Sequence, residues 1–332
     1  MRGKGNKAIC LVLLGALLLA AGLSLFAGAV RVPANEFFRS QIIQLRLARI
    51  VLAIVAGAGL SAAGVIFQAL LRNPLAEPYV LGVSSGAGVG AAAAIVLRSS
   101  ALAGPWLVAL GPWPLPALAF VGALGTVLLV YGLAREADGS LPVQTLLLSG
   151  VIVSAMLGSI LMFLVSVSTA ENLHDVIWWL LGNLQIFDWK LLWAVATVVA
   201  AGTLVTVLLA RDLNAMTLGD EPAAHLGLNV RRTRMLFFLL GSLMTAAAVA
   251  ACGLIGFVGL IVPHAVRLAL GPEHRRLVPA SALAGGTFLV IADAFARTVM
   301  SPVEIPIGVV TALMGGPFFL YLLHRRRRSY WR

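Results

Sequence analysis

The residue types that most often do chemistry are sparse in this chain, and their spacing does not build a known catalytic site. The sequence has no G-x-x-x-x-G-K-[ST] motif, which nucleotide-binding loops use for phosphates, and no zinc-binding H-E-x-x-H motif. Its five histidines are scattered. The string GVSSG, from Gly82 to Gly86, matches the G-x-S-x-G elbow of hydrolases loosely, but it opens an apolar segment with no strand before it. The pattern argues against an enzyme and against a metal site.

Two acids close to apolar segments have both a functional and a structural interpretation. Asp293 and Glu304 flank a turn between the last two apolar segments, and Arg297 follows Asp293 by one helical turn. An ionisable group within a membrane is a functional candidate by default. Because a cation lies within reach of both acids, we interpret them as members of a structural ion pair rather than as a proton relay.

The composition indicates an all-α protein that crosses a membrane many times. Of 332 residues, 60% are hydrophobic and 11% are charged, whereas soluble domains carry roughly 25% charged residues. The net charge of +11 fits an excess of Lys and Arg in cytoplasmic loops better than a nucleic-acid surface. Cys10 and Cys252 both lie in apolar segments, which is typical of small buried side chains.

Ten apolar segments approach the length of about 20 residues that a membrane crossing needs. The tenth, 253–270, is interrupted by glycines and Pro263, so we expect a short or irregular helix with Pro263 and His264 near its cytoplasmic end. Both chain ends are basic, so the positive-inside rule places both in the cytoplasm and requires an even number of crossings. We expect one transmembrane domain, residues 1–332, with a retained first helix. The nine clear segments are 8–30, 47–70, 79–97, 115–134, 146–167, 191–210, 235–251, 280–296 and 307–323.

Three connecting stretches carry further signals. A tight hinge with two prolines, RNPLAEP at 72–78, joins two apolar segments, and the second of these opens on small residues that favour close helix packing. The outer loop 168–189 is amphipathic and rich in tryptophan, which predicts a short interfacial helix. The cytoplasmic loop 211–234 has an acidic start before Pro222 and a stop at Gly227, which predicts one or two short helices on that face.

An ordered set of motifs resembles one known family. RLARIVLAIVAGAGLSAAGVIFQALLRNPLAEP begins at Arg46, and YVLGVSSGAGVGAA follows it directly. LLLSGV at 146–151, WWLLG at 178–182, LGDEPAAHLGL at 218–228 and GLIGFVGLIVPHAVRLALGPEHRRLVP at 253–279 continue the series. LVIADAFAR at 289–297 and EIPIGVVTALMGGPFF at 304–319 complete it. The chain is similar to the FecCD-type permeases of ATP-binding-cassette (ABC) importers, which serve iron-siderophores, haem and cobalamin.

The resemblance implies an architecture and a set of partners. It implies the type II ABC importer permease fold, with about ten transmembrane helices in each subunit of a homodimer. It also implies two cytoplasmic ATPase subunits that carry ATP and Mg, with no cofactor on this chain, and a periplasmic or lipid-anchored substrate-binding protein. The expected location is the cytoplasmic (inner) membrane of a bacterium or archaeon, with both termini in the cytoplasm.

Three groups of site residues follow from the same resemblance. The first group would dock the external binding protein through its glutamates, the second would contact the ATPase, and the third would form the gate and the translocation pathway. The docking residues are Arg46, Arg49 and Arg297. The ATPase-coupling residues are Asp220, Glu221, Ala223, Ala224, Leu226 and Gly227. The gate and pathway residues are Asn73, Leu75, Ser84, Ser85, Gly86, Val143 and Gln144.

The expected function is ATP-driven import of an iron(III)-siderophore or a related metal chelate. Cobalamin and haem are the alternative substrates within the same family. A secondary transporter coupled to protons or sodium is the rival from another class. It would need acidic residues along the pathway, and this sequence has almost none away from the ends of its loops.

Overall fold

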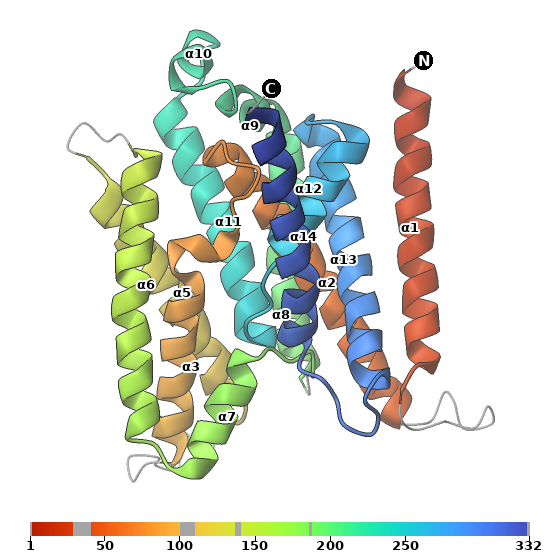
Figure 1. Cartoon of the computed structure of the whole chain (residues 1–332), viewed down its shortest axis with the longest axis vertical. Helices are drawn as coiled ribbons and strands as arrows, with labels where there is room; N and C mark the ends of the chain where they lie inside the picture. The colour runs from red at the N-terminus through yellow and green to blue at the C-terminus, as the bar shows by residue number, and fades with distance from the viewer. Residues whose placement is uncertain (1, 29–40, 100–109, 137–140, 186–187, 331–332) are drawn as a thin grey trace.

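The computed structural model describes residues 2–28, 41–99, 110–136, 141–185 and 188–330, and these residues form helices with no strand. Figure 1 shows the helices as one bundle, most of them running along its long axis. The elements are α1 (Arg2–Phe26), α2 (Gln41–Leu70), η1 (Pro78–Leu81), α3 (Val83–Ser99), α5 (Pro114–Ala134), α6 (Val143–Ser166), α7 (Ala170–Leu180), α8 (Trp189–Leu208), α9 (Ala210–Met216), α10 (Asp220–His225), α11 (Val230–Cys252), α12 (Val258–Leu270), α13 (His274–Thr298) and α14 (Ile307–Tyr330).

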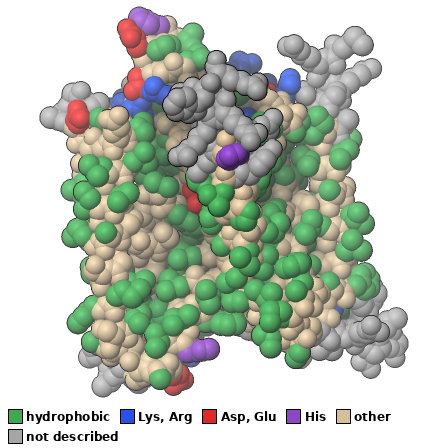
Figure 2. Space-filling view, viewed as in Figure 1, with side chains coloured by type: hydrophobic (Ala, Val, Ile, Leu, Met, Phe, Trp, Pro, Cys, Tyr) green, Lys and Arg blue, Asp and Glu red, His purple; other side chains and the backbone are tan. Residues whose placement is uncertain are grey.

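The ten expected apolar segments each correspond to a helix. Among the described residues, seven helices are long and apolar enough to cross a membrane, and the shorter apolar helices are α3, α12 and the first part of α14. Figure 2 shows charged side chains gathered at the two ends of the visible face, while the band between them is apolar except for one acidic side chain. This separation of charged ends from an apolar middle is what a bilayer requires.

The two ends of the bundle are distinguished by their short helices. Figure 1 shows α10 at one end and α7 at the other, and both the start of α1 and the end of α14 lie at the α10 end. The helix α7 confirms the predicted surface helix. Its N-cap Thr169 accepts a hydrogen bond from the backbone N–H of Asn172, and Trp178 is half-exposed.

Helix α2 forms the centre of the bundle, where glycines allow backbones to approach closely. It packs against α8, α11, α12 and α13. A Cβ atom added at Gly57 would clash with the backbone of Gly285 in α13, and one added at Gly64 would clash with the backbone of Gly259 in α12. In lipid, where no hydrophobic force drives helices together, such contacts supply much of the packing energy.

Two segments that interrupt the α-helices meet inside the bundle and satisfy each other's polar groups. After α2 the chain turns back through residues 71–82, and between α11 and α12 it is non-helical at 253–257. The Glu77 carboxylate accepts a hydrogen bond of 2.5 Å from the backbone N–H of Phe257. The Tyr79 hydroxyl donates to the Ile255 carbonyl at 3.1 Å and accepts from the Ile255 N–H at 3.2 Å. These contacts replace the hydrogen bonds that a continuous helix would have made.

The predicted irregular crossing at 253–270 is confirmed in part and corrected in one respect. The segment is irregular only up to Phe257, whose φ of 68° lies in the left-handed region, and it is helical from Val258 onward. Pro263 and His264 therefore lie in the middle of α12, not near its end. Pro263 has no N–H for the Gly259 carbonyl, and Gln68 of α2 donates to that carbonyl instead, at 3.3 Å.

Candidate functional site

The loop 211–234 folds as predicted, into two short helices at the α10 end of the bundle. α9 occupies Ala210–Met216 and α10 occupies Asp220–His225, and Gly227 ends the second helix with a φ of 85°. Of the predicted coupling residues, Glu221, Ala224, Leu226 and Gly227 are exposed, whereas Ala223 is fully buried. Leu218 and Leu226 are each 65% exposed at this polar end of the molecule. The role of this surface in contacting an ATPase stays a prediction.

Asp220 is the one predicted coupling residue that is anchored by charge. Its carboxylate accepts from the guanidinium of Arg72, at the end of α2, and from that of Arg234, near the start of α11. Asp220 is half-exposed, Arg72 is similarly exposed, and the Arg234 side chain is buried. The coupling loop is therefore tied to two long helices of the bundle.

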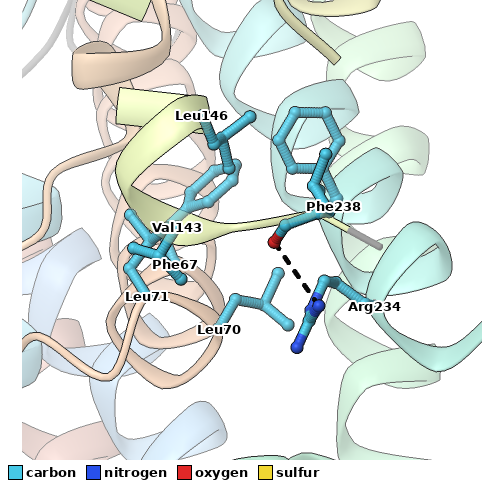
Figure 3. Close-up of a pocket in the computed structure, with 8 residues that line it drawn as sticks. Phe67, Leu70, Leu71, Val143, Leu146, Arg234 and Phe238 are labelled. Atoms are coloured by element: carbon cyan, nitrogen blue, oxygen red, sulfur yellow. Dashed lines mark hydrogen bonds between the residues drawn. The ribbon is translucent and has the colours of Figure 1, made fainter. Parts of the chain in front are cut away.

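The predicted gate residues lie at the same end, on two elements. Asn73 shapes the turn after α2, because its side-chain oxygen accepts from the backbone N–H of Leu75 at 3.0 Å. Val143 and Gln144 begin α6. Val143 lines a small cavity together with Arg234, whereas Gln144 is exposed. Val143 is the predicted gate residue that lines the cavity in Figure 3, and the role of all four residues as a gate stays a prediction.

The small residues that open α3 have two different environments. Gly86 is buried where α3 crosses α5, and a Cβ atom there would clash with Thr126 and with the Gly122 carbonyl. Ser84 and Ser85 are partly exposed. In this conformation Gly86 acts as a helix-packing residue, while the two serines keep access to the surface. The pathway role of all three stays a prediction.

The three predicted docking arginines form a buried network at the α7 end. Arg49 donates to Asp293 at 2.7 Å and to Glu304 at 2.8 Å. Arg297 donates to the other oxygen of Asp293 at 2.9 Å and to the Ser24 hydroxyl at 2.7 Å. Arg46 donates to the Leu25 carbonyl at 2.9 Å. The predicted ion pair of Asp293 is thus confirmed, and Arg49, rather than Arg297, bridges Asp293 to Glu304.

This buried network holds several elements of the bundle together, independently of any role in docking. Arg46 is 8% exposed, Arg297 is 5% exposed and Asp293 is fully buried. Removing one member of a buried ion pair leaves the other charged, desolvated and unpaired, which is costly. The network joins the end of α1, the start of α2, the end of α13 and the turn before α14. Docking by these arginines stays a prediction, and it would use a surface that is already held in place.

Sequence reasoning missed Arg72, Arg234 and Glu77 as site residues. Arg72 and Arg234 read as ordinary basic residues at the cytoplasmic ends of membrane segments. The sequence signal that could have identified these two arginines was Asp220, because an acid in an arginine-rich loop is expected to pair with cations. Glu77 was part of the hinge motif, but its partner Phe257 lies 180 residues further along the chain. No spacing rule connects residues so far apart.

Comparison with known proteins identifies the family. Residues 16–325 match the FecCD transport family. The chain is 45% identical over 282 residues to the cobalamin import system permease protein BtuC of Halobacterium salinarum, covering 85% of this chain and 73% of the relative. It is 39% identical over 287 residues to the hemin transport system permease protein HmuU of Yersinia pestis, covering 86% of this chain and 84% of the relative.

Two further comparisons cover nearly the full length. The Fe(3+) dicitrate transport system permease protein FecD of Escherichia coli is 38% identical over 330 residues, covering 96% of this chain and 99% of that protein. A solved structure described as an inward-facing metal-chelate type ABC transporter superposes with a TM-score of 0.83 at 31% identity, covering 96% of this chain and 99% of that chain. With the family model matching residues 16–325 and relatives aligned over most of the chain, the chain belongs to the FecCD transport family of ABC importer permeases.

Proposed function

We propose that this chain is the membrane-spanning subunit of an ABC importer, working as a homodimer with two ATPase subunits and an external substrate-binding protein. ATP and Mg would bind to the ATPase, since this sequence has no phosphate-binding motif. The observation that carries the proposal is the α10 end, where a short exposed helix is anchored by charge to α2 and α11. Because ATP hydrolysis would take place on the partner, this chain needs a surface through which a conformational change of the ATPase can act on it.

The proposed orientation places the α10 end, with both termini, in the cytoplasm of a bacterium or archaeon. Three arginines, Arg231, Arg232 and Arg234, follow α10 closely, and a run of four arginines lies near the end of α14. The positive-inside rule supports this orientation. The α7 end, with the arginine network, would then face the external binding protein.

The proposed substrate is a metal chelate, with an iron(III)-siderophore first and haem or cobalamin as alternatives. The relatives named above are designated for ferric dicitrate, hemin and cobalamin, so the class of large metal-containing chelates is common to all three. The described part of the chain holds no cluster of three or more metal-ligating side chains.

Vesicle uptake separates ATP-driven import from ion-coupled transport. The chain would be reconstituted with its ATPase and its binding protein, and uptake of ferric citrate, haemin and cobalamin would be followed separately. We expect uptake of one chelate to require hydrolysable ATP and to persist when an uncoupler removes ion gradients. An ATPase variant without its catalytic base is the matched control. Uptake that continues without ATP but stops with the uncoupler would establish the rival secondary transporter.

Docking of the binding protein at the arginine network can be tested through Glu304. The side chain of Glu304 is 39% exposed, and its carboxylate partly neutralises the positive charge of Arg49. The change Glu304→Gln leaves more positive charge facing an incoming glutamate, so we expect association with the binding protein to be about twofold to fivefold faster at low salt. Glu171→Gln on α7 removes a negative charge elsewhere at the same end and serves as control. An association rate that is the same for Glu304→Gln and wild type would refute docking at this network.

A further inference from the structure

The carboxylate of Asp220 connects α10 to two long helices at a single point. Arg72 approaches it from just after the end of α2, and Arg234 from the second turn of α11, with an N–O distance of 2.5 Å for the latter. We call Asp220, Arg72 and Arg234 the Asp220 junction. Because one oxygen, Oδ1, accepts from both guanidinium groups, any displacement of Asp220 changes both contacts together.

Arg234 extends the junction to α6. Its second terminal nitrogen donates to the Leu141 carbonyl at 3.4 Å, two residues before α6 begins. Figure 3 shows this bond at the edge of a small cavity, whose labelled lining residues come from α2, α6 and α11. Two of the lining residues, Phe238 of α11 and Phe67 of α2, pack edge-on with ring centroids 6.1 Å apart. The junction therefore adjoins the cavity at which the end of α2, the start of α6 and the first half of α11 meet.

The backbone at Arg72 is specialised for this contact. Its φ of 47° is in the left-handed region, which is uncommon for a residue other than glycine. The turn ends α2, begins the segment that carries Asn73, and places Arg72 beside α10. Arginines at membrane edges often do no more than extend into the aqueous phase. Here, however, two arginines from different helices converge on one acid, and that acid opens the predicted coupling helix.

We propose that the Asp220 junction transmits the movement of α10 to the turn after α2 and to the start of α6, with Arg72 and Arg234 as positioning residues. The inference rests on the proposed function, because the ATPase must act on α10. Closely packed interfaces move as rigid pieces rather than deforming continuously. A shared charged contact lets one short helix displace two gate elements at once.

The test measures chelate imported per ATP hydrolysed in the reconstituted vesicles. Asp220→Asn removes the charge with little change in volume. We expect import per ATP hydrolysed to fall about tenfold, in the upper part of the range seen for coupling mutations. A merely structural role would lower hydrolysis and import in proportion and leave the ratio unchanged. Asp212→Asn in α9 makes the same charge change at the same end and should keep the wild-type ratio.

If Asp220→Asn does not assemble with the ATPase, a second variant tests the same proposal. Arg72→Asn cuts only the link to α2 and retains a residue that tolerates the left-handed backbone. It should also lower import per ATP. A wild-type ratio in every variant that assembles would overturn the junction while leaving ATP-driven import intact. Absence of ATP-driven import in the wild type would instead overturn the proposed function, and the inference with it.

Discussion

Replacing Asp293 by alanine is expected to destabilise the protein by about 3–5 kcal/mol, the usual cost of removing one partner from a buried ion pair. Asp293 is fully buried and holds Arg49 at 2.7 Å and Arg297 at 2.9 Å. Both arginines are themselves largely buried, so without Asp293 each loses its main counter-charge where water cannot replace it. Thermal unfolding of the purified protein in detergent measures the effect.

Glu304→Ala is the matched control for Asp293→Ala. Glu304 pairs with the same Arg49, but its side chain is 39% exposed, so water compensates for much of what is lost. We expect a much smaller loss of stability than for Asp293→Ala. Equal melting temperatures for Asp293→Ala and wild type would show that the network at the α7 end does not hold α2 and α13 together.

The second large effect is expected from a single methyl group at Gly64. A Cβ atom there would overlap the carbonyl group of Gly259, and because the obstacle is backbone, no side-chain rotation relieves it. Overpacking of a well-packed core typically costs about 1–3 kcal/mol, and here α2 and α12 must separate. We expect Gly64→Ala to reduce sharply the amount of monodisperse protein and its unfolding temperature.

A glycine-to-alanine substitution on α5 should leave the stability of the protein unchanged or raise it slightly. A Cβ atom at Gly132 meets nothing within 4 Å, and the site is on an exposed helical face. Alanine is favoured over glycine within helices by about 1 kcal/mol, so Gly132→Ala should be neutral or slightly stabilising. If Gly64→Ala behaved like Gly132→Ala, the close approach of α2 and α12 would be contradicted.

The crossings and the short helices were predictable because their signals are local. Hydrophobic length predicted the ten crossing helices, and Pro222 with Gly227 predicted the helix that became α10. The beginnings of the long helices were less predictable. α2 begins at Gln41, six residues before the predicted start at Leu47, because Gln44 and Arg46 interrupt the apolar run without interrupting the helix.

The partners of the charged and polar groups were not predictable, because they lie far apart in the sequence. Asp293 with Arg297 was found because the two residues are one turn apart on a helix. Arg49 is 244 residues from Asp293, and Arg72 is 148 residues from Asp220. Such pairs are set by how α2 packs against α13 and by how α10 folds back over the bundle. The sequence could show that the acids needed partners, but only the three-dimensional arrangement identified them.

In the proposed function, ATP hydrolysis by a partner ATPase moves a metal chelate through a pathway built by this chain. The most direct measurement is chelate accumulation in vesicles that contain the chain, its ATPase and its binding protein, with and without hydrolysable ATP. We expect accumulation only with ATP, and only when the binding protein is present outside. Accumulation that is independent of ATP and follows an ion gradient would contradict the claim.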